Sequence, residues 1–134
     1  MRRGLLLGIA ALGLSPALAR AAETTQHMLN STDIALYTTE DLYRVCTVRS
    51  DDPLEVQAIN LCQGFLLGVV SYHDAVADRQ HLKRLICYPQ TATRDQGIEA
   101  FIAWGASHQR DQKYMTEPAV YGAVRGLASK WPCK

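Results

Sequence analysis

The sequence predicts an all-α protein, a small disulfide-bonded helical bundle of about four helices. Four helix-start signals recur along the 134 residues. No segment shows the sustained apolar–polar alternation, or the Asn-Gly or Asp-Gly turn, that indicates a β-hairpin. The four cysteines are an even number in a chain that begins with an export signal, so disulfides are expected.

Residues 1–21 are predicted to be a secretory signal peptide. Two arginines precede an apolar run at 4–14, and the small-residue stretch Ala17–Ala21 offers a cleavage site. A transmembrane anchor would need about 20 consecutive apolar residues, but Pro16 and Arg20 interrupt this segment. The sequence therefore predicts a periplasmic protein without a membrane anchor after cleavage.

Composition excludes several classes of protein. The chain is 48% hydrophobic and 20% charged, which excludes a disordered or collagen-like chain. Removal of residues 1–21 takes away three arginines and leaves 11 basic against 13 acidic residues, so the formal charge moves from +1 to −2. A mildly acidic domain does not favour a nucleic-acid partner.

The mature chain divides into a predicted flexible arm at 22–37, docked through Ile34, Leu36 and Tyr37, and a single helical domain at 38–134. The first helix of the domain is expected to be short. It begins at the N-cap Thr38, with Asp41 three residues on, and ends near residue 50.

The second helix has the strongest start signal, with Asp52 as N-cap, Pro53 at the first helical position and Glu55 two residues later. Apolar residues spaced three and four apart predict one buried stripe: Ala58, Leu61, Cys62, Phe65, Leu66, Val69 and Tyr72. Gly64 and Gly68 share one face, which predicts close packing against another helix. The helix is expected to run out into a polar connector at 73–84.

An extended return to the core is predicted at 85–89, because Pro89 disfavours helix before it. The third helix starts at the capping box of Thr93 and Gln96 and fades at the polar turn 108–113. The fourth starts near residue 116 and stops at Pro132. Its expected inward residues follow the helical period: Val120, Val124, Leu127 and Trp131.

Four cysteines allow three pairings, among which antiparallel helical hairpins supply a preference. Cys46 and Cys62 lie at similar heights on either side of the turn between the first two helices. Cys87 and Cys133 flank the last two helices at the end opposite their turn. The favoured pairs are therefore Cys46–Cys62 and Cys87–Cys133.

No catalytic constellation emerges from the sequence, and neither a cofactor nor a metal is predicted. The chain has no CxxC pair, and His73 and His81 are eight apart, not four as in a helical metal pair. Ser71 lacks the glycine-rich elbow of a hydrolase nucleophile. The prediction is a protein that is not an enzyme.

Several motifs together resemble the Rap/Tai family of type VI secretion immunity proteins. The residues that carry the resemblance follow one another from the second helix to the C-terminus: Cys62-Gln63-Gly64-Phe65-Leu66-Leu67-Gly68, Cys87-Tyr88-Pro89, Thr93, Gln96, Trp104, His108, Ala128 and Trp131-Pro132-Cys133. The resemblance implies a periplasmic immunity protein that binds a cognate peptidoglycan amidase effector and blocks its active site, as a homodimer. The alternative is a general periplasmic helical binding protein or acid-stress chaperone-like protein without a cognate toxin.

The partner-binding surface is expected in the long polar connector, because long loops in compact domains are disproportionately functional. Its candidate residues are charged or polar: His73, Asp74, Asp78, Arg79 and His81. The 108–113 turn is the alternative surface.

Overall fold

The structure is a computed structural model that describes residues 35–134. The predicted signal peptide and the predicted arm up to Ile34 lie outside the described residues. Within them the chain forms helices and no strand, which confirms the predicted all-α fold. The helices are α1 (Thr39–Cys46), α2 (Glu55–Gln80), α3 (Arg94–His108), α4 (Gln112–Met115) and α5 (Ala119–Lys130).

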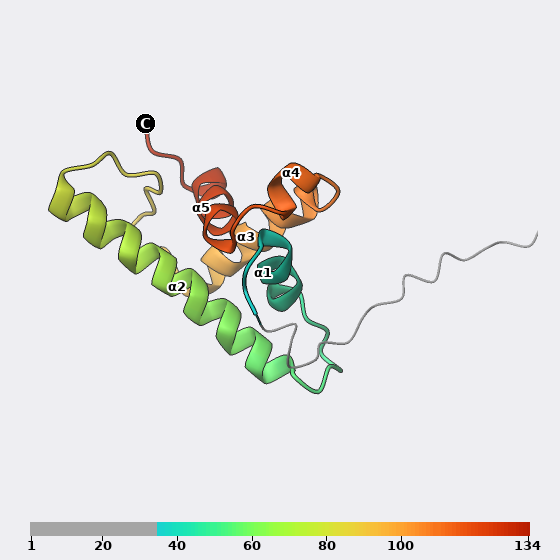
Figure 1. Ribbon diagram of the computed structural model, residues 1–134. Helices are drawn as coiled ribbons and strands as arrows, with labels where there is room; N and C mark the ends of the chain where they lie inside the picture. The colour runs from blue at the N-terminus through green and yellow to red at the C-terminus, as the bar shows by residue number, and fades with distance from the viewer. Residues whose placement is uncertain (1–34) are drawn as a thin grey trace, which may run out of the picture.

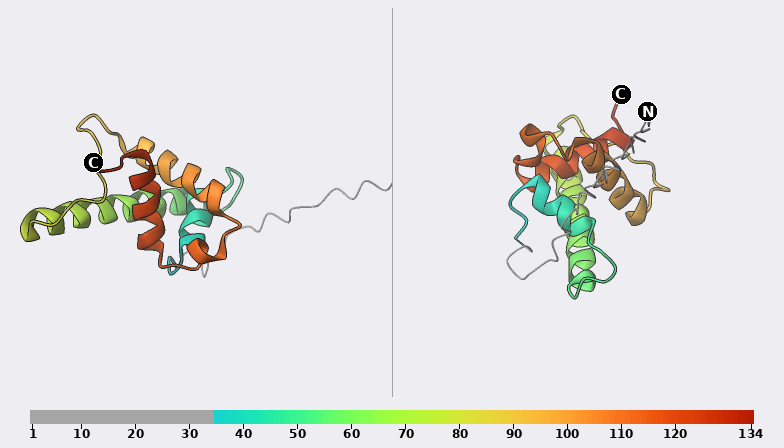
Figure 2. Two further views of the ribbon diagram at one scale, coloured as in Figure 1. Left: turned by 90° about the horizontal axis from the view of Figure 1, so that it is seen from above. Right: turned by 90° about the vertical axis from the view of Figure 1, so that its right-hand side faces the viewer.

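The long helix α2 lies along one side of the bundle, and the shorter helices pack against one flank of it (Figure 1). Seen from above, the C-terminal end of α2 projects past α5 (Figure 2). The described part of the chain holds no helix long and apolar enough to cross a bilayer. Residues 35–134 form five helices instead of the expected four, because the single turn α4 begins within the predicted polar turn and ends at Met115.

Helix α1 begins as predicted. The Thr38 side chain accepts a hydrogen bond from the Asp41 backbone N–H, and the Asp41 carboxylate accepts one from the Thr38 N–H, a complete capping box. Of the arm residues expected to dock, Leu36 packs against the core and Tyr37 is 80% exposed.

Helix α2 begins and ends later than predicted. Asp52 is not the N-cap, because its side chain instead accepts from the Leu54 N–H in a local turn, so the first helical residue is Glu55. The helix continues through the charged segment to Gln80, since polar residues there line an exposed helix face. Ala58, Cys62 and Leu66 of the expected stripe are buried, but Tyr72 is 73% exposed.

Helix α3 has the predicted capping box between Thr93 and Gln96. Helix α5 lies between Pro118 and Pro132 as expected, and Leu127 of its predicted inward residues is buried. Val120 is instead 40% exposed, and the rest of the buried side consists of small residues: Ala119, Gly122, Ala123 and Gly126. Small residues are needed there because α5 packs so closely against α1 and α3.

The predicted close packing at Gly64 and Gly68 is wrong for the described chain. A Cβ added at either position would meet no heavy atom of residues 35–134 within 4 Å beyond the local backbone of α2. Both glycines are exposed, away from the buried residues Ala58, Cys62 and Leu66 of α2. The close approaches occur instead at Gly122, against Thr39, and at Gly105, against Tyr43.

Both predicted disulfides are confirmed. Cys46 and Cys62 join α1 to α2, with their Cα atoms 5.1 Å apart. Cys87 and Cys133 join the connector to the C-terminus, with a Cα separation of 5.0 Å. The second bond ties down a segment that contributes the fully buried Ile86.

Candidate partner-binding site

The predicted partner-binding residues lie at the projecting end of α2. His73, Asp74, Asp78 and Arg79 belong to its last turns, and His81 is its C-cap. The connector from residue 82 to 93 then turns back toward the bundle (Figure 2). These residues are therefore brought together on one element, but they do not share one environment.

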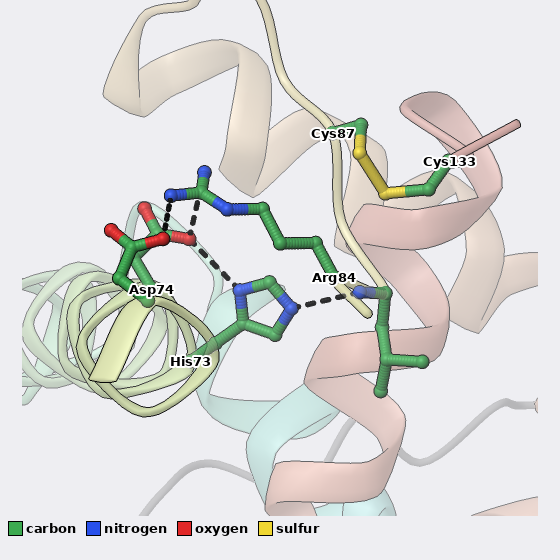
Figure 3. The surroundings of a disulfide bond; sticks show 7 residues. His73, Asp74, Arg84, Cys87 and Cys133 are labelled. Atoms are coloured by element: carbon green, nitrogen blue, oxygen red, sulfur yellow. Dashed lines mark hydrogen bonds and ion pairs between the residues drawn. A yellow bond between two sulfur atoms is a disulfide. The ribbon is translucent and has the colours of Figure 1, made fainter. Parts of the chain in front are cut away.

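His73 and Asp74 are engaged within the chain (Figure 3). The His73 side chain is only 10% exposed; its Nδ1 lies 2.9 Å from Asp74 Oδ1, and its Nε2 accepts the Leu85 backbone N–H at 2.9 Å. The Tyr88 hydroxyl donates to the other Asp74 oxygen. These contacts bind the connector to α2, so neither residue is a free surface group.

Arg84 links the carboxylates on successive turns of α2. Its guanidinium donates to Asp78 Oδ1 at 2.7 Å and lies 3.6 Å from Asp74 Oδ1. Burial alone raises the pKa of Asp74, but hydrogen bonds from Tyr88 and His73 and the charge of Arg84 outweigh it and lower that pKa. The Asp74 hydrogen bond and burial raise the pKa of Tyr88. The cluster therefore favours an ionised Asp74 and a protonated Tyr88.

Arg79 and His81 differ from His73 and Asp74. Their side chains are exposed and form no hydrogen bond or ion pair with residues 35–134. His81 adopts the left-handed conformation with φ 52°, which closes the helix through hydrogen bonds from its own N–H and that of Leu82 to the Ala77 carbonyl. Only glycine adopts this conformation without steric cost. A histidine at this position therefore lowers the stability of the protein, and it places an exposed imidazole at the C-terminal end of α2.

Two exposed leucines complete this surface, and the pattern of charged residues in the sequence does not indicate them. Leu82 is 57% exposed and Leu85 58% exposed. We define the connector surface as Asp78, Arg79, His81, Leu82 and Leu85. Isolated leucines between charged residues carry no periodic signal, so only their exposure in the fold identifies them. Apolar side chains amid charges are typical of protein-binding surfaces.

An apolar cleft of about 310 Å³ lies between α2, the connector and the C-terminal end of α5. Its walls include Leu67, Val70, Tyr88, Leu127 and Trp131. The Tyr88 and Trp131 rings meet edge to face at 6.3 Å beside the Cys87–Cys133 disulfide that anchors both segments. Tyr88 belongs both to this cleft and to the cluster around Asp74.

The alternative surface at 108–113 is largely committed to structure. The His108 ring stacks on Trp104 at 4.6 Å and meets Tyr114 edge to face at 5.1 Å. The Asp111 side chain caps α4. Arg110 and Lys113 are the exposed basic residues of this turn. The Lys113 ammonium group lies over the Tyr114 ring.

The described residues contain no group of three or more His, Cys, Asp or Glu side chains placed to hold a metal ion. All four cysteines are in disulfides.

These features define a small all-α protein in which one disulfide joins α1 to α2 and the other ties the connector after α2 to the C-terminus. The family model of the Rap1a immunity proteins matches residues 38–133, and the chain belongs to this family. It is thus an immunity protein, whose partner is a cognate effector. No curated protein and no solved structure matches the chain.

Proposed function

We propose that this protein acts in the periplasm, where it neutralises a type VI secretion amidase that cleaves peptidoglycan by blocking the enzyme's active site. Membership of the Rap1a immunity family supports an inhibitory role. The predicted signal peptide and the two disulfides agree with an oxidising compartment outside the cytoplasm. The amidase is the effector class implied by the resemblance of the sequence.

The projecting end of α2 carries this proposal. A blocking element must reach into a partner's cleft, and the connector surface extends beyond the rest of the bundle. The element is also held in shape by the Cys87–Cys133 disulfide and by the contacts of Asp74 with Tyr88 and His73. Ordering before binding lowers the entropic cost of association. Leu82 and Leu85 supply apolar contact, while Asp78 and Arg79 supply charge.

Alanine substitution tests this surface. The double variant Asp78→Ala/Arg79→Ala should weaken binding to the cognate amidase by about tenfold or more, measured by calorimetry, and should restore amidase activity on peptidoglycan. Its melting temperature should change little, because both side chains are exposed and an ion pair at the surface, such as Asp78–Arg84, contributes little to stability. The matched control is Arg110→Ala/Lys113→Ala, on the other exposed turn.

Retained affinity in the first variant and lost affinity in the control would assign binding to the 108–113 turn instead. If no amidase is recovered from periplasmic extract and the protein instead prevents aggregation of acid-denatured proteins, the chaperone-like alternative gains support.

The homodimer implied by the resemblance would use the solvent-exposed side of α2, including Leu67, which also lines the cleft beside α5. The sequence has no Lys, Arg, Asp or Glu between Glu55 and Asp74, although this face is open to solvent. Val56 is 67% exposed and Leu67 49% exposed. Such a face pairs with a second copy without like-charge repulsion, and its glycines allow close backbone approach.

Sedimentation velocity tests this arrangement. The wild-type protein is expected to dimerise, and Leu67→Asp should yield a monomer, because a twofold axis would bring two carboxylates together in an apolar contact. Val120→Asp, at a similarly exposed position on α5, should remain a dimer. A wild-type monomer at all concentrations, or a dimer that survives Leu67→Asp, would contradict this interface.

A further inference from the structure

His73 joins two parts of the chain through its two ring nitrogens. Its Nε2 lies 2.9 Å from the backbone nitrogen of Leu85, in the connector, and its Nδ1 lies 2.9 Å from Asp74 Oδ1, on α2. The two contacts hold the middle of the connector against the helix. Farther along the chain, two other contacts hold the connector. The Cys87 N–H donates a hydrogen bond to the Trp131 carbonyl, and Cys87 forms a disulfide with Cys133.

The two partners determine the protonation state of the ring. A peptide N–H can only donate, so Nε2 must present its lone pair to Leu85. The Asp74 carboxylate accepts, so the single proton of a neutral imidazole is on Nδ1. Both bonds therefore require neutral His73 in the Nδ1–H form.

We propose that His73 is a proton-sensitive latch that positions the connector surface. A proton taken up from solvent binds Nε2 and turns this acceptor into a donor. The Leu85 N–H then faces a second N–H, so their hydrogen bond is lost. The Nδ1 bond to Asp74 remains, and Leu85 is released from α2, while the Arg84–Asp78 ion pair and the Cys87–Cys133 disulfide hold the residues on either side of it.

Two charged groups lie close to the His73 ring. The Asp74 carboxylate contacts its Nδ1, and the Arg84 guanidinium lies 3.6 Å from Asp74. Tyr88 donates to Asp74, and Asp78 pairs with Arg84 on the outer side. No other titratable side chain of residues 35–134 forms a hydrogen bond or ion pair with His73.

The latch connects to function only through the proposed role of the connector surface, which includes Leu82 and Leu85. If that surface binds the effector, acid conditions would lower affinity by releasing Leu85 from its position. The latch itself is a property of the isolated protein. It is therefore tested without an effector, so that its failure and the failure of the proposed function are separate results.

Nuclear magnetic resonance of the isotope-labelled mature protein tests the latch from about pH 8 to about pH 5, the interval in which histidines take up their second proton. His73 should be the Nδ1–H form at the upper end. The Leu85 amide proton should shift along the titration curve of His73, and not along that of the exposed His81. Its exchange protection, corrected for intrinsic rate, should fall about tenfold, as expected for one lost net hydrogen bond.

Two variants separate the latch from a general structural role. His73→Gln keeps an acceptor that does not titrate, so Leu85 protection should persist and become independent of pH. His73→Leu should lose the protection at every pH. Several results would overturn the inference: an Nε2–H form at about pH 8, a His73 ring that stays neutral throughout, a Leu85 amide that ignores His73 titration, or an unchanged pH dependence in His73→Gln.

Discussion

Gly126 on α5 lies so close to Phe101 on α3 that a Cβ on the glycine would come within 2.9 Å of the Phe101 Cα. A contact to backbone cannot be relieved by a side-chain rotation, so one of the two helices would have to move. Phe101 is fully buried at the centre of the core. Among the glycines of residues 35–134, the close approach to a neighbouring backbone is therefore between α5 and α3, and not on α2 where the glycine spacing predicts it.

Gly126→Ala should destabilise the protein by about 1–3 kcal/mol through overpacking, although alanine is the better helix former. Gly68→Ala is the matched control, because its added Cβ meets open space in the described chain. It should raise the free energy of unfolding by up to about 1 kcal/mol through helix propensity. Urea unfolding measures both. Equal effects at the two positions would show that α5 is not held against α3 as described.

Loss of the Cys87–Cys133 bond should destabilise more than loss of the Cys46–Cys62 bond. The two bonds close loops with sequence separations of 46 and 16 residues. Loop-closure entropy predicts about 4 and about 3 kcal/mol for double serine variants. Denaturant unfolding of the two variants tests the order, and non-reducing peptide mapping verifies the remaining bond in each. A larger loss from the shorter loop would contradict the entropic account.

The hydrogen bond from Tyr88 to Asp74 should make stability depend on pH at both extremes. The lowered pKa of Asp74 means that its contribution is present above the ordinary aspartate value of about 3.9 and is lost as pH falls through the folded-state pKa. The raised pKa of Tyr88 means that its contribution is present below about pH 10 and is lost as pH rises through the folded-state pKa.

The stability advantage of wild type over Tyr88→Phe should therefore be largest near neutral pH and shrink toward both ends. Unfolding in urea across the pH range measures this difference. Tyr72→Phe serves as the control, since the Tyr72 side chain is 73% exposed and its variant should give a difference that does not vary with pH. A flat profile for Tyr88→Phe would mean that the hydroxyl does not bind the carboxylate in solution.

His81→Gly should stabilise the protein by about 1 kcal/mol, because glycine adopts the left-handed backbone of this C-cap without a Cβ clash. Thermal unfolding measures the gain. Gln80→Gly, one residue earlier and inside α2, should instead destabilise by about 1 kcal/mol. If the connector surface binds the effector, the more stable His81→Gly variant should bind it more weakly. A gain in affinity would show that the imidazole is not a contact.

Local signals in the sequence determine the helix starts at Thr38 and Thr93. In each capping box the two partners are three residues apart, so the hydrogen bonds depend on neighbouring residues and little else. The disulfide pairing was also predictable, because two antiparallel hairpins bring Cys46 to Cys62 and the chain segments around the last two helices together. The overall all-α class follows from the same helical periodicity.

The start of α2 shows where local signals compete. Asp52 and Pro53 form an N-terminal signature, but the Asp52 side chain closes a turn with the Leu54 N–H and delays the helix to Glu55. The predicted end of α2 near residue 73 is also wrong, because a run of charged residues suits an exposed helix face as well as a loop. Contacts of the connector residues Leu85 and Tyr88 with His73 and Asp74 stabilise the helical form of this segment.

The sequence by itself determined where most of the helical segments begin, favoured the cysteine pairs that form, and made the segment following residue 73 a candidate binding region. Only the tertiary structure decided that Gly126, and not Gly68, lies against a neighbouring backbone, and that His73 holds Leu85 while Arg79 and His81 face solvent. The physical reason is the distance along the chain over which each interaction acts. Caps and periodicity act within one helical turn, whereas side-chain exposure and hydrogen bonds across 12 residues depend on where other elements pack.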